Sequence, residues 1–404
     1  MTGTSAEGSC SMRLSSPHLT ENKGDINMAT NAAGIIFSNL HDANISELTN
    51  IRTMSSVPFG GRYRFIDFAL SNMVHAGITD VNVITHNSYK SLMDHVGSGK
   101  DWDLARRSGG LRILPPYISP SSKGGTLYTT RLEALRSVLE VIANIKEDVI
   151  VLSDCDSICN IDLTDMLKQH AASGVPVTIA VKRMKLSEEK AAHETVVVSD
   201  DDGYVKEVVK APTDIDGELD VEMNIVAIDK VFLYSSVREA ESRGSTSLSA
   251  DIMPSRIAKR LVKVYRYDGF YADVTSMADY YACSMSILEK GNRDALFAVK
   301  DRPILTKVRN SAPTKYVDGC KVTNSLIADG CVIEGEVENS VLFRGVKVGK
   351  GTVVKNSILF QDTLTGENVF LNCVIADKNT VITDNVMLSG HSSVPFYIEK
   401  GRKI

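Results

Sequence analysis

Residues 131–153 read RLEALRSVLEVIANIKEDVIVLS, a helical stretch at 131–145 followed at once by an apolar run at 149–153. Three further apolar runs bounded by turn residues have the same character, at 32–37 (AAGIIF), 81–85 (VNVIT) and 175–181 (VPVTIAV). Continuous apolar runs spaced by helical stretches are typical of parallel strands that are covered on both faces. The sequence therefore predicts an α/β domain with a mostly parallel sheet, whose ligands bind at the carboxyl ends of the strands.

Beyond Pro303 the pattern changes, because apolar positions now recur every six residues. One row contains Val346, Thr352, Ile358, Leu364 and Phe370, and a second contains Val369, Ile375, Val381 and Met387. Glycine and asparagine residues fall between these positions, where a three-cornered coil needs left-handed backbone angles. The period predicts a left-handed parallel β-helix of hexapeptide repeats, whose exposed end favours oligomerisation. A β-sandwich with coincidental spacing is the alternative.

With 404 residues, the chain is too long for one ordinary core. We expect a disordered tail at 1–30, with Met28 as a plausible alternative start, a nucleotidyltransferase-like domain at 31–295 and a β-helix at 303–404. A net charge of −5 gives no basic face for nucleic acid, and no apolar run is long enough for a secretory signal or a membrane span. Seven scattered cysteines favour the cytoplasm, and Cys155 and Cys159 suit buried walls better than a zinc site.

The segment VPFGGRYRFIDFALSNMVHAG at 57–77, with Asn50, Ile51 and Arg52 before it, closely resembles the N-terminal signature of bacterial glucose-1-phosphate adenylyltransferase. The resemblance runs from about residue 31 to the end and includes His95, Trp102-Asp103-Leu104 and Asp273-Val274. It implies a Rossmann-like nucleotidyltransferase domain with a mixed, mostly parallel sheet. In this family ATP and glucose 1-phosphate give ADP-glucose and pyrophosphate for glycogen synthesis, by in-line attack that depends on positioning and charge neutralisation.

The residues that would hold the triphosphate in this family are altered. The family has a glycine-rich loop that ends in arginine, but residues 34–44 read GIIFSNLHDAN, with one glycine and no lysine or arginine. Phe37, Leu40 and His41 would block the close approach that glycine permits, and Asp42 would repel an anion. Met54 stands where the resemblance places a lysine. ATP binding in the family's usual pose is therefore not expected.

The sugar side shows three corresponding changes. Lys210-Ala211-Pro212 places Ala211 where the family has its phosphate-binding lysine. Thr130-Arg131 replaces a Gly-Thr pair before the helix, and Glu222-Met223-Asn224 replaces Ser-Met-Gly, which puts a carboxylate where a sugar should rest. Each lost charged contact is worth about 1.5–3 kcal/mol. Several such losses together predict little independent catalysis.

Two groups of family residues remain. Asp156 and Asp273 match the pair that holds Mg²⁺ against the phosphates, although aspartates at strand ends also form ordinary turns. Arg52, Arg62 and Arg64 lie in the segment that the resemblance assigns to phosphorylated effectors and subunit contacts. Solvent-facing arginines around the turn at 60–61 are the alternative. We expect Trp102, the only tryptophan, to be a packing residue.

A retained scaffold with altered ligand positions is similar to the GlgD-type subunit of this family. The resemblance then implies a regulatory, cytoplasmic chain with weak or no activity, in a mixed tetramer with a catalytic subunit and with a nucleotide or sugar-phosphate effector. The alternative is an active, Mg²⁺-dependent adenylyltransferase with a divergent loop. An acyltransferase is a further class, for which His391 is the only histidine after residue 300. A purely structural assembly protein is the remaining alternative.

Overall fold

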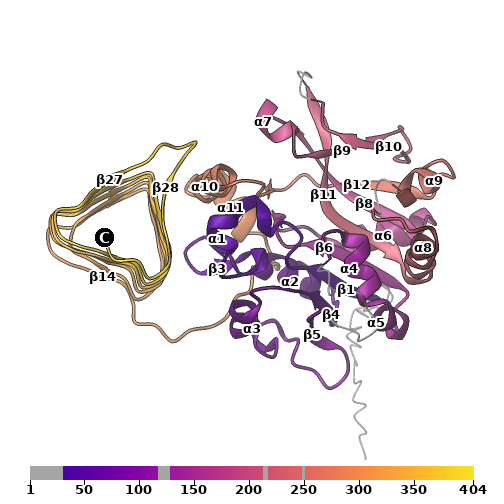
Figure 1. Ribbon diagram of the computed structural model, residues 1–404, viewed down its shortest axis with the longest axis horizontal. Coiled ribbons are helices and arrows are strands. Elements are labelled where there is room, and N and C mark those ends of the chain that lie inside the picture. The colour runs from indigo at the N-terminus through magenta and orange to yellow at the C-terminus, as the bar shows by residue number, and fades with distance from the viewer. Residues whose placement is uncertain (1–30, 117–127, 213–216, 248–250) are drawn as a thin grey trace, which may run out of the picture.

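The computed structural model describes residues 31–116, 128–212, 217–247 and 251–404. Figure 1 shows an α/β body beside a three-sided coil that is seen along its axis. The predicted tail at 1–30 lies outside the described residues. No helix within those residues is long and apolar enough to cross a membrane.

A nine-stranded mixed sheet forms the centre of the α/β body. Its parallel half has the order β6-β1-β4-β5, and beyond β6 the strand β11 runs antiparallel to both β6 and β8. The sequence predicted β1, β4, β6 and β8, but not β5, β11, β12 or the β9–β10 hairpin. The strands are β1 (Ala32–Phe37), β4 (Asp80–Ile84), β5 (Gly110–Leu114), β6 (Val149–Asp154), β8 (Val177–Lys185), β9 (Thr195–Ser199), β10 (Val205–Lys210), β11 (Glu218–Asp229) and β12 (Val262–Arg266).

Helices cover both faces of the sheet, because alternate residues of β1 enter two different cores. Ala32 and Ile36 pack with α2 and α6, whereas Ala33 and Ile35 pack with α4, α5 and α8. The predicted helix at 131–145 is divided at Val138, whose backbone leaves helical angles (φ −118°, ψ 19°). The helices are α1 (Ser46–Thr49), α2 (Phe65–His75), α3 (Lys90–Val96), α4 (Arg131–Ser137), α5 (Leu139–Asn144), α6 (Leu163–Ser173), α7 (Glu188–Ala191), α8 (Lys230–Arg243), α9 (Met253–Ile257), α10 (Met277–Ser286) and α11 (Lys290–Phe297).

The C-terminal region is a parallel β-helix whose three sheets form the sides of the triangle in Figure 1. The predicted change from an α/β fold to a parallel β-helix is confirmed. One side contains β14 (Lys315–Tyr316), β17 (Val332–Ile333), β20 (Lys347–Val348), β23 (Leu364–Thr365) and β26 (Val381–Ile382). The second contains β15 (Lys321–Thr323), β18 (Glu336–Glu338), β21 (Val353–Lys355), β24 (Phe370–Asn372) and β27 (Met387–Ser389). The third contains β16 (Leu326–Ile327), β19 (Val341–Leu342), β22 (Ile358–Leu359), β25 (Val374–Ala376) and β28 (Phe396–Ile398).

The predicted six-residue rows are partly wrong, because some of their members face solvent and not the interior of the coil. Thr352 and Ile358 are fully buried, but the next interior side chain is Thr363 at 0% exposure, whereas Leu364 is 36% exposed. Lys347 pairs with Leu364, so this turn of the coil contains 17 residues, one fewer than three sides of six residues would take. The shorter side turns Leu364 outward, and Met387 is 75% exposed.

The coil is docked on the α/β body through buried contacts. Tyr280 and Phe360 meet edge to face at a ring distance of 6.2 Å, and the Tyr281 hydroxyl donates to the Asn356 carbonyl oxygen at 2.6 Å. Arg52 donates to both oxygens of Asp377, at 2.8 and 2.6 Å. The coil therefore packs against the segment around Arg52, for which the resemblance predicted effector binding.

Candidate functional site

A polar cavity of about 380 Å³ lies at the carboxyl ends of β1 and β6, the edge where ligands were expected. Its walls come from the loop after β1, the start of α4, the turn between β6 and β7 (Ile158–Cys159), the start of β9, the end of β10, β11 and the segment after β13 (Tyr271–Ala272). The lining includes His41, Arg131, Asp156, His193, Glu194, Lys210, Glu222 and Asp273. The sequence therefore predicted the shared location of Asp156 and Asp273.

The loop after β1 is closed by its own side chains. Asn39 Oδ1 accepts hydrogen bonds from the Thr85 hydroxyl at 2.7 Å and from the His86 amide at 3.0 Å. Asp42 accepts from the Met54 amide at 2.7 Å, and burial raises the pKa of Asp42 to about 6. The partly buried Asp42 carboxyl group and the buried Met54 thus occupy the region that the resemblance assigned to phosphate-binding groups.

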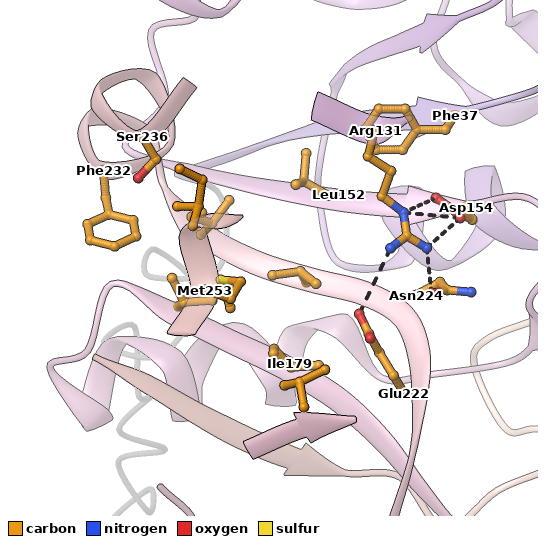
Figure 2. Close-up of a pocket in the computed structure, with 15 residues that line it drawn as sticks. Phe37, Arg131, Leu152, Asp154, Ile179, Glu222, Asn224, Phe232, Ser236 and Met253 are labelled. Atoms are coloured by element: carbon orange, nitrogen blue, oxygen red, sulfur yellow. Dashed lines mark hydrogen bonds and ion pairs between the residues drawn. The ribbon is translucent and has the colours of Figure 1, made fainter. Parts of the chain in front are cut away.

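Arg131, at the first turn of α4, points at Asp154, the last residue of β6 (Figure 2). The Arg131 guanidinium donates to both oxygens of Asp154, with Nη2 2.6 Å from Oδ2 and Nε 3.1 Å from Oδ1. It also contacts Asn224 and lies 4.0 Å from Glu222. From the sequence, Arg131 was noted only as part of the Thr130-Arg131 pair that replaces Gly-Thr. Its ion pair with Asp154 was not predicted, because Asp154 lies on another element. A fixed guanidinium therefore fills this part of the cavity.

His41 completes this group from the loop after β1. Its Nε2 lies 2.8 Å from Asp154 Oδ2 and 3.6 Å from Asp156 Oδ2. The negative charge of Asp156 raises the pKa of His41 to about 9. Although burial acts to raise the pKa of Asp154, the charge of Arg131 and the hydrogen bond from His41 lower it to about 2. Arg131, Asp154 and His41 thus form an ion cluster next to the loop that follows β1.

Four buried carboxyl groups face the same cavity: Asp156, Glu194, Glu222 and Asp273. Burial raises the pKa of each of them, that of Glu194 to about 7. The charge of Asp156 raises the pKa of Asp273 further. Crowded carboxyl groups disfavour a phosphorylated sugar, because an anion adds to their repulsion.

One basic side chain of the cavity was missed. Lys210 lines it, next to the buried Ala211 that stands at the family's lysine position, and its Nζ donates to the His193 carbonyl oxygen at 3.3 Å. Spacing alone could not place Lys210 there, because alternate residues of a strand point to opposite faces. The cavity therefore keeps a lysine, but bound to the backbone.

The donor set fits Mg²⁺ in part. Asp156 Oδ1 is buried without a hydrogen-bond partner, and Asp273 lines the same cavity, so two carboxylates border space that can hold an ion with its waters. Ligand atoms of His41, Asp154 and Asp156 lie within 4.8 Å of one another, a group that does not include Asp273. The predicted pair, Asp156 and Asp273, thus lines one cavity. The side chains whose possible ligand atoms lie closest together are instead His41, Asp154 and Asp156.

The three predicted effector arginines do not all line one cavity. Arg62 is exposed and lines a second cavity with Arg64, which is buried and donates to the Ser91 carbonyl oxygen at 2.6 Å. Arg52 is not in that lining, because its guanidinium is buried against Asp377. The sequence missed Arg309, Arg344 and Lys378, which complete the lining from the linker and the coil. Only folding brings these three basic side chains to Arg62 and Arg64.

A third cavity lies behind Arg131, between the sheet and helices α8 and α9 (Figure 2). Its walls are mostly apolar, with Leu152, Ile179 and Met253 among them. Arg131, Glu222 and Asn224 border both this cavity and the polar one. Arg131, Glu222 and Asn224 therefore lie between the polar cavity and the apolar cavity.

Comparison with known proteins agrees with a chain made of an α/β domain followed by a coil of repeats. A nucleotidyl transferase family model matches residues 44–290, and a model described as GlmU-like, C-terminal hexapeptide matches residues 312–392. The chain is 33% identical to the glycogen biosynthesis protein GlgD of Bacillus subtilis, over 80% of this chain and 82% of that protein. It is 32% identical to the glucose-1-phosphate adenylyltransferase of Thermosipho africanus, over 80% of this chain and 78% of that enzyme.

Proposed function

The chain belongs to the glucose-1-phosphate adenylyltransferase family of glycogen biosynthesis, and from that premise we propose that it is a GlgD-type regulatory subunit. The observation that carries the proposal is the Arg131–Asp154 pair, which fills the region where the family's smaller Gly-Thr pair would leave space. Its catalytic partner would be a family member with an intact glycine-rich loop.

The chemistry of the cavity supports this role. Transfer of a nucleotidyl group needs positive charge arranged around a triphosphate. Arg131 is instead neutralised by Asp154, and four carboxyl groups border the remaining space. When bound, Mg²⁺ would be held by Asp156 and Asp273 and would supply charge neutralisation for phosphate oxygens.

An active enzyme with a divergent loop is the second candidate. The specific observation in its favour is that Asp156 and Asp273 line one cavity, with an unpaired oxygen on Asp156. Against it stand the closed loop after β1 and the backbone-bound Lys210. The regulatory role accounts for both sets of observations, because it requires the scaffold without the phosphate ligands.

Association with a catalytic subunit, in a mixed tetramer in the cytoplasm, is part of the same proposal. Several apolar side chains on the outside of the coil are available for subunit contacts, among them Tyr316 at 54%, Met387 at 75% and Val394 at 72% exposure. Seven scattered cysteines, of which the six described ones are free, suit a reducing compartment.

Co-expression with the intact-loop family member of the same organism tests this function directly. We expect the two chains to co-elute on sizing as one complex, and the partner's kcat, KM or effector response to differ from that of the partner alone. The matched control is a chain with charged replacements at Met387 and Val394, which should weaken co-elution if the coil surface is used. Failure of the two wild-type chains to associate would refute the proposal.

An anionic effector is expected to bind the cavity formed by Arg62, Arg64, Arg309, Arg344 and Lys378. Burial, together with the charges of Arg64 and Arg52, lowers the pKa of Lys378 to about 6, although Asp377 opposes this. Burial also lowers the pKa of His95, another titratable group in the lining. Lys378 is thus largely uncharged at neutral pH until an anion restores its proton.

Binding of sulfate should therefore weaken as the pH rises above about 6, by up to about tenfold per pH unit. Sulfate is the suitable probe because its own charge is constant over this range, and calorimetry at several pH values gives the slope. Lys378→Met should bind more weakly at low pH and lose most of the slope. An unchanged slope in that variant would assign the proton to another group. AMP and fructose 1,6-bisphosphate can then be ranked at the pH of tightest binding.

A further inference from the structure

We propose that His41, Asp154 and Asp156 form a binding site for a transition-metal ion such as Zn²⁺ or Co²⁺. This site differs from the Asp156–Asp273 pair that the family's Mg²⁺ chemistry implies, since it uses a nitrogen ligand from the loop after β1. The inference does not depend on the regulatory role, because it concerns ion binding and not catalysis.

The geometry of the three side chains is the first support. One ligand atom from each lies within 4.8 Å of the other two. His41 Nε2 is 2.8 Å from Asp154 Oδ2 and 3.6 Å from Asp156 Oδ2. Two ligand atoms of a tetrahedral zinc ion are about 3.3 Å apart when each bond is about 2.0–2.1 Å. The observed separations lie on either side of that value, so small side-chain rotations would complete the site.

The second support is an unsatisfied polar group at the same place. Asp156 is 1% exposed, and its Oδ1 has no hydrogen-bond partner. A buried carboxylate oxygen that lacks a partner is costly, and a cation is one of the few ligands that can satisfy it. Asp156 also borders the polar cavity of about 380 Å³, which gives an ion a path of entry and room for bound water.

The donor types select the kind of ion. Imidazole nitrogen suits Zn²⁺, Co²⁺ and Cu²⁺, whereas Mg²⁺ prefers oxygen ligands and keeps most of its waters. Arg131 holds Asp154 through its guanidinium and would act as the outer partner that orients a ligating carboxylate. The ring of His41 is about one-third exposed, so its Nε2 can release its proton to solvent and exchange the contact with Asp154 for a metal bond without disturbing the core.

The test is a titration of the full chain, carrying no histidine tag, with Co²⁺ followed by visible absorption, and with Zn²⁺ by calorimetry. We expect one saturable site whose Co²⁺ spectrum is displaced by Zn²⁺ and not by an excess of Mg²⁺. His41→Ala should weaken the affinity by more than the roughly 10- to 100-fold typical of losing an outer partner. His193→Ala, which alters another histidine of the same cavity, should leave the affinity unchanged.

Two carboxylate variants separate this site from the family's metal pair. Asp273→Asn should keep Co²⁺ and Zn²⁺ binding, whereas Asp156→Asn should lose it, and thermal melts establish that each variant is folded. The proposal is overturned if wild type shows no saturable site, or if His41→Ala binds Co²⁺ as wild type does. It is equally overturned if binding is lost in Asp273→Asn and retained in His41→Ala, because the ion would then sit on the Asp156–Asp273 pair.

Discussion

Purified alone and supplied with ATP, glucose 1-phosphate and Mg²⁺, the chain should form ADP-glucose at least about 10⁴-fold more slowly than an intact-loop relative, because loss of a single preorganised electrostatic group costs about 10²- to 10³-fold in rate. The resemblance assigns such groups to the loop after β1 and to position 54, where this chain has no lysine or arginine. Coupled release of pyrophosphate is the measurement.

The relative assayed at the same concentrations is the matched control for this experiment. A second control is Asp273→Asn, which should change the residual rate little if the carboxylate pair no longer takes part in turnover. A wild-type rate close to that of the relative, abolished by Asp273→Asn, would instead establish the divergent active enzyme. The partner chain must be absent from the preparation, because traces of it would dominate the rate.

Replacing Arg52 with methionine should lower the free energy of unfolding by about 3–5 kcal/mol, because the substitution leaves Asp377 buried without its cation. Arg52 and Asp377 are 3% and 0% exposed, so solvent cannot compensate for the loss. Urea denaturation followed by the fluorescence of Trp102 measures the change, since this single tryptophan is fully buried in the α/β body.

The double variant Arg52→Met/Asp377→Asn is the matched control for that prediction. In wild type the Lys378 amide and the Tyr397 hydroxyl donate to different oxygens of Asp377. After Asp377→Asn the side-chain amide oxygen can accept from the Lys378 amide, while the NH2 group can donate to the Tyr397 hydroxyl oxygen. We expect this variant to recover most of the lost stability, because no buried charge remains unpaired. If the double variant is as unstable as the sum of the two single variants, the pair carries no coupling energy.

Much of the fold follows from the sequence, because apolar runs report burial directly. The predicted strand at 32–37 is β1, and the apolar runs at 81–85 and 149–153 lie within one residue of β4 and β6. The long strand β11 was not predicted, because it lacks the continuous apolar run of the other central strands, although its polar–apolar alternation is itself typical of a strand. It is also interrupted by a register shift between Glu222 and Val226. Its place in the sheet depends on pairing with distant strands and not on local pattern.

The candidate site was predictable only where a motif carried it. Asp156 and Asp273 were found by resemblance, and the fold places both at one cavity. The cluster of Arg131, Asp154 and His41 was not found, because its members come from three separate elements and each has an ordinary local explanation. The motif of Arg52 indicated a ligand role, and the fold adds a buried structural partner, Asp377, that the sequence did not indicate.

The five-residue side of the coil limits how this domain can change length. The buried Ile358 and Thr363 bracket the short side, and each later strand lies directly over one in the preceding coil. Adding or removing one residue there would exchange interior and exterior for every following strand, since neighbouring positions face opposite ways. Gain or loss of an entire coil would instead preserve the stacking. Natural variation in this domain should therefore come in whole turns, with single-residue changes confined to the corners that bulge into solvent.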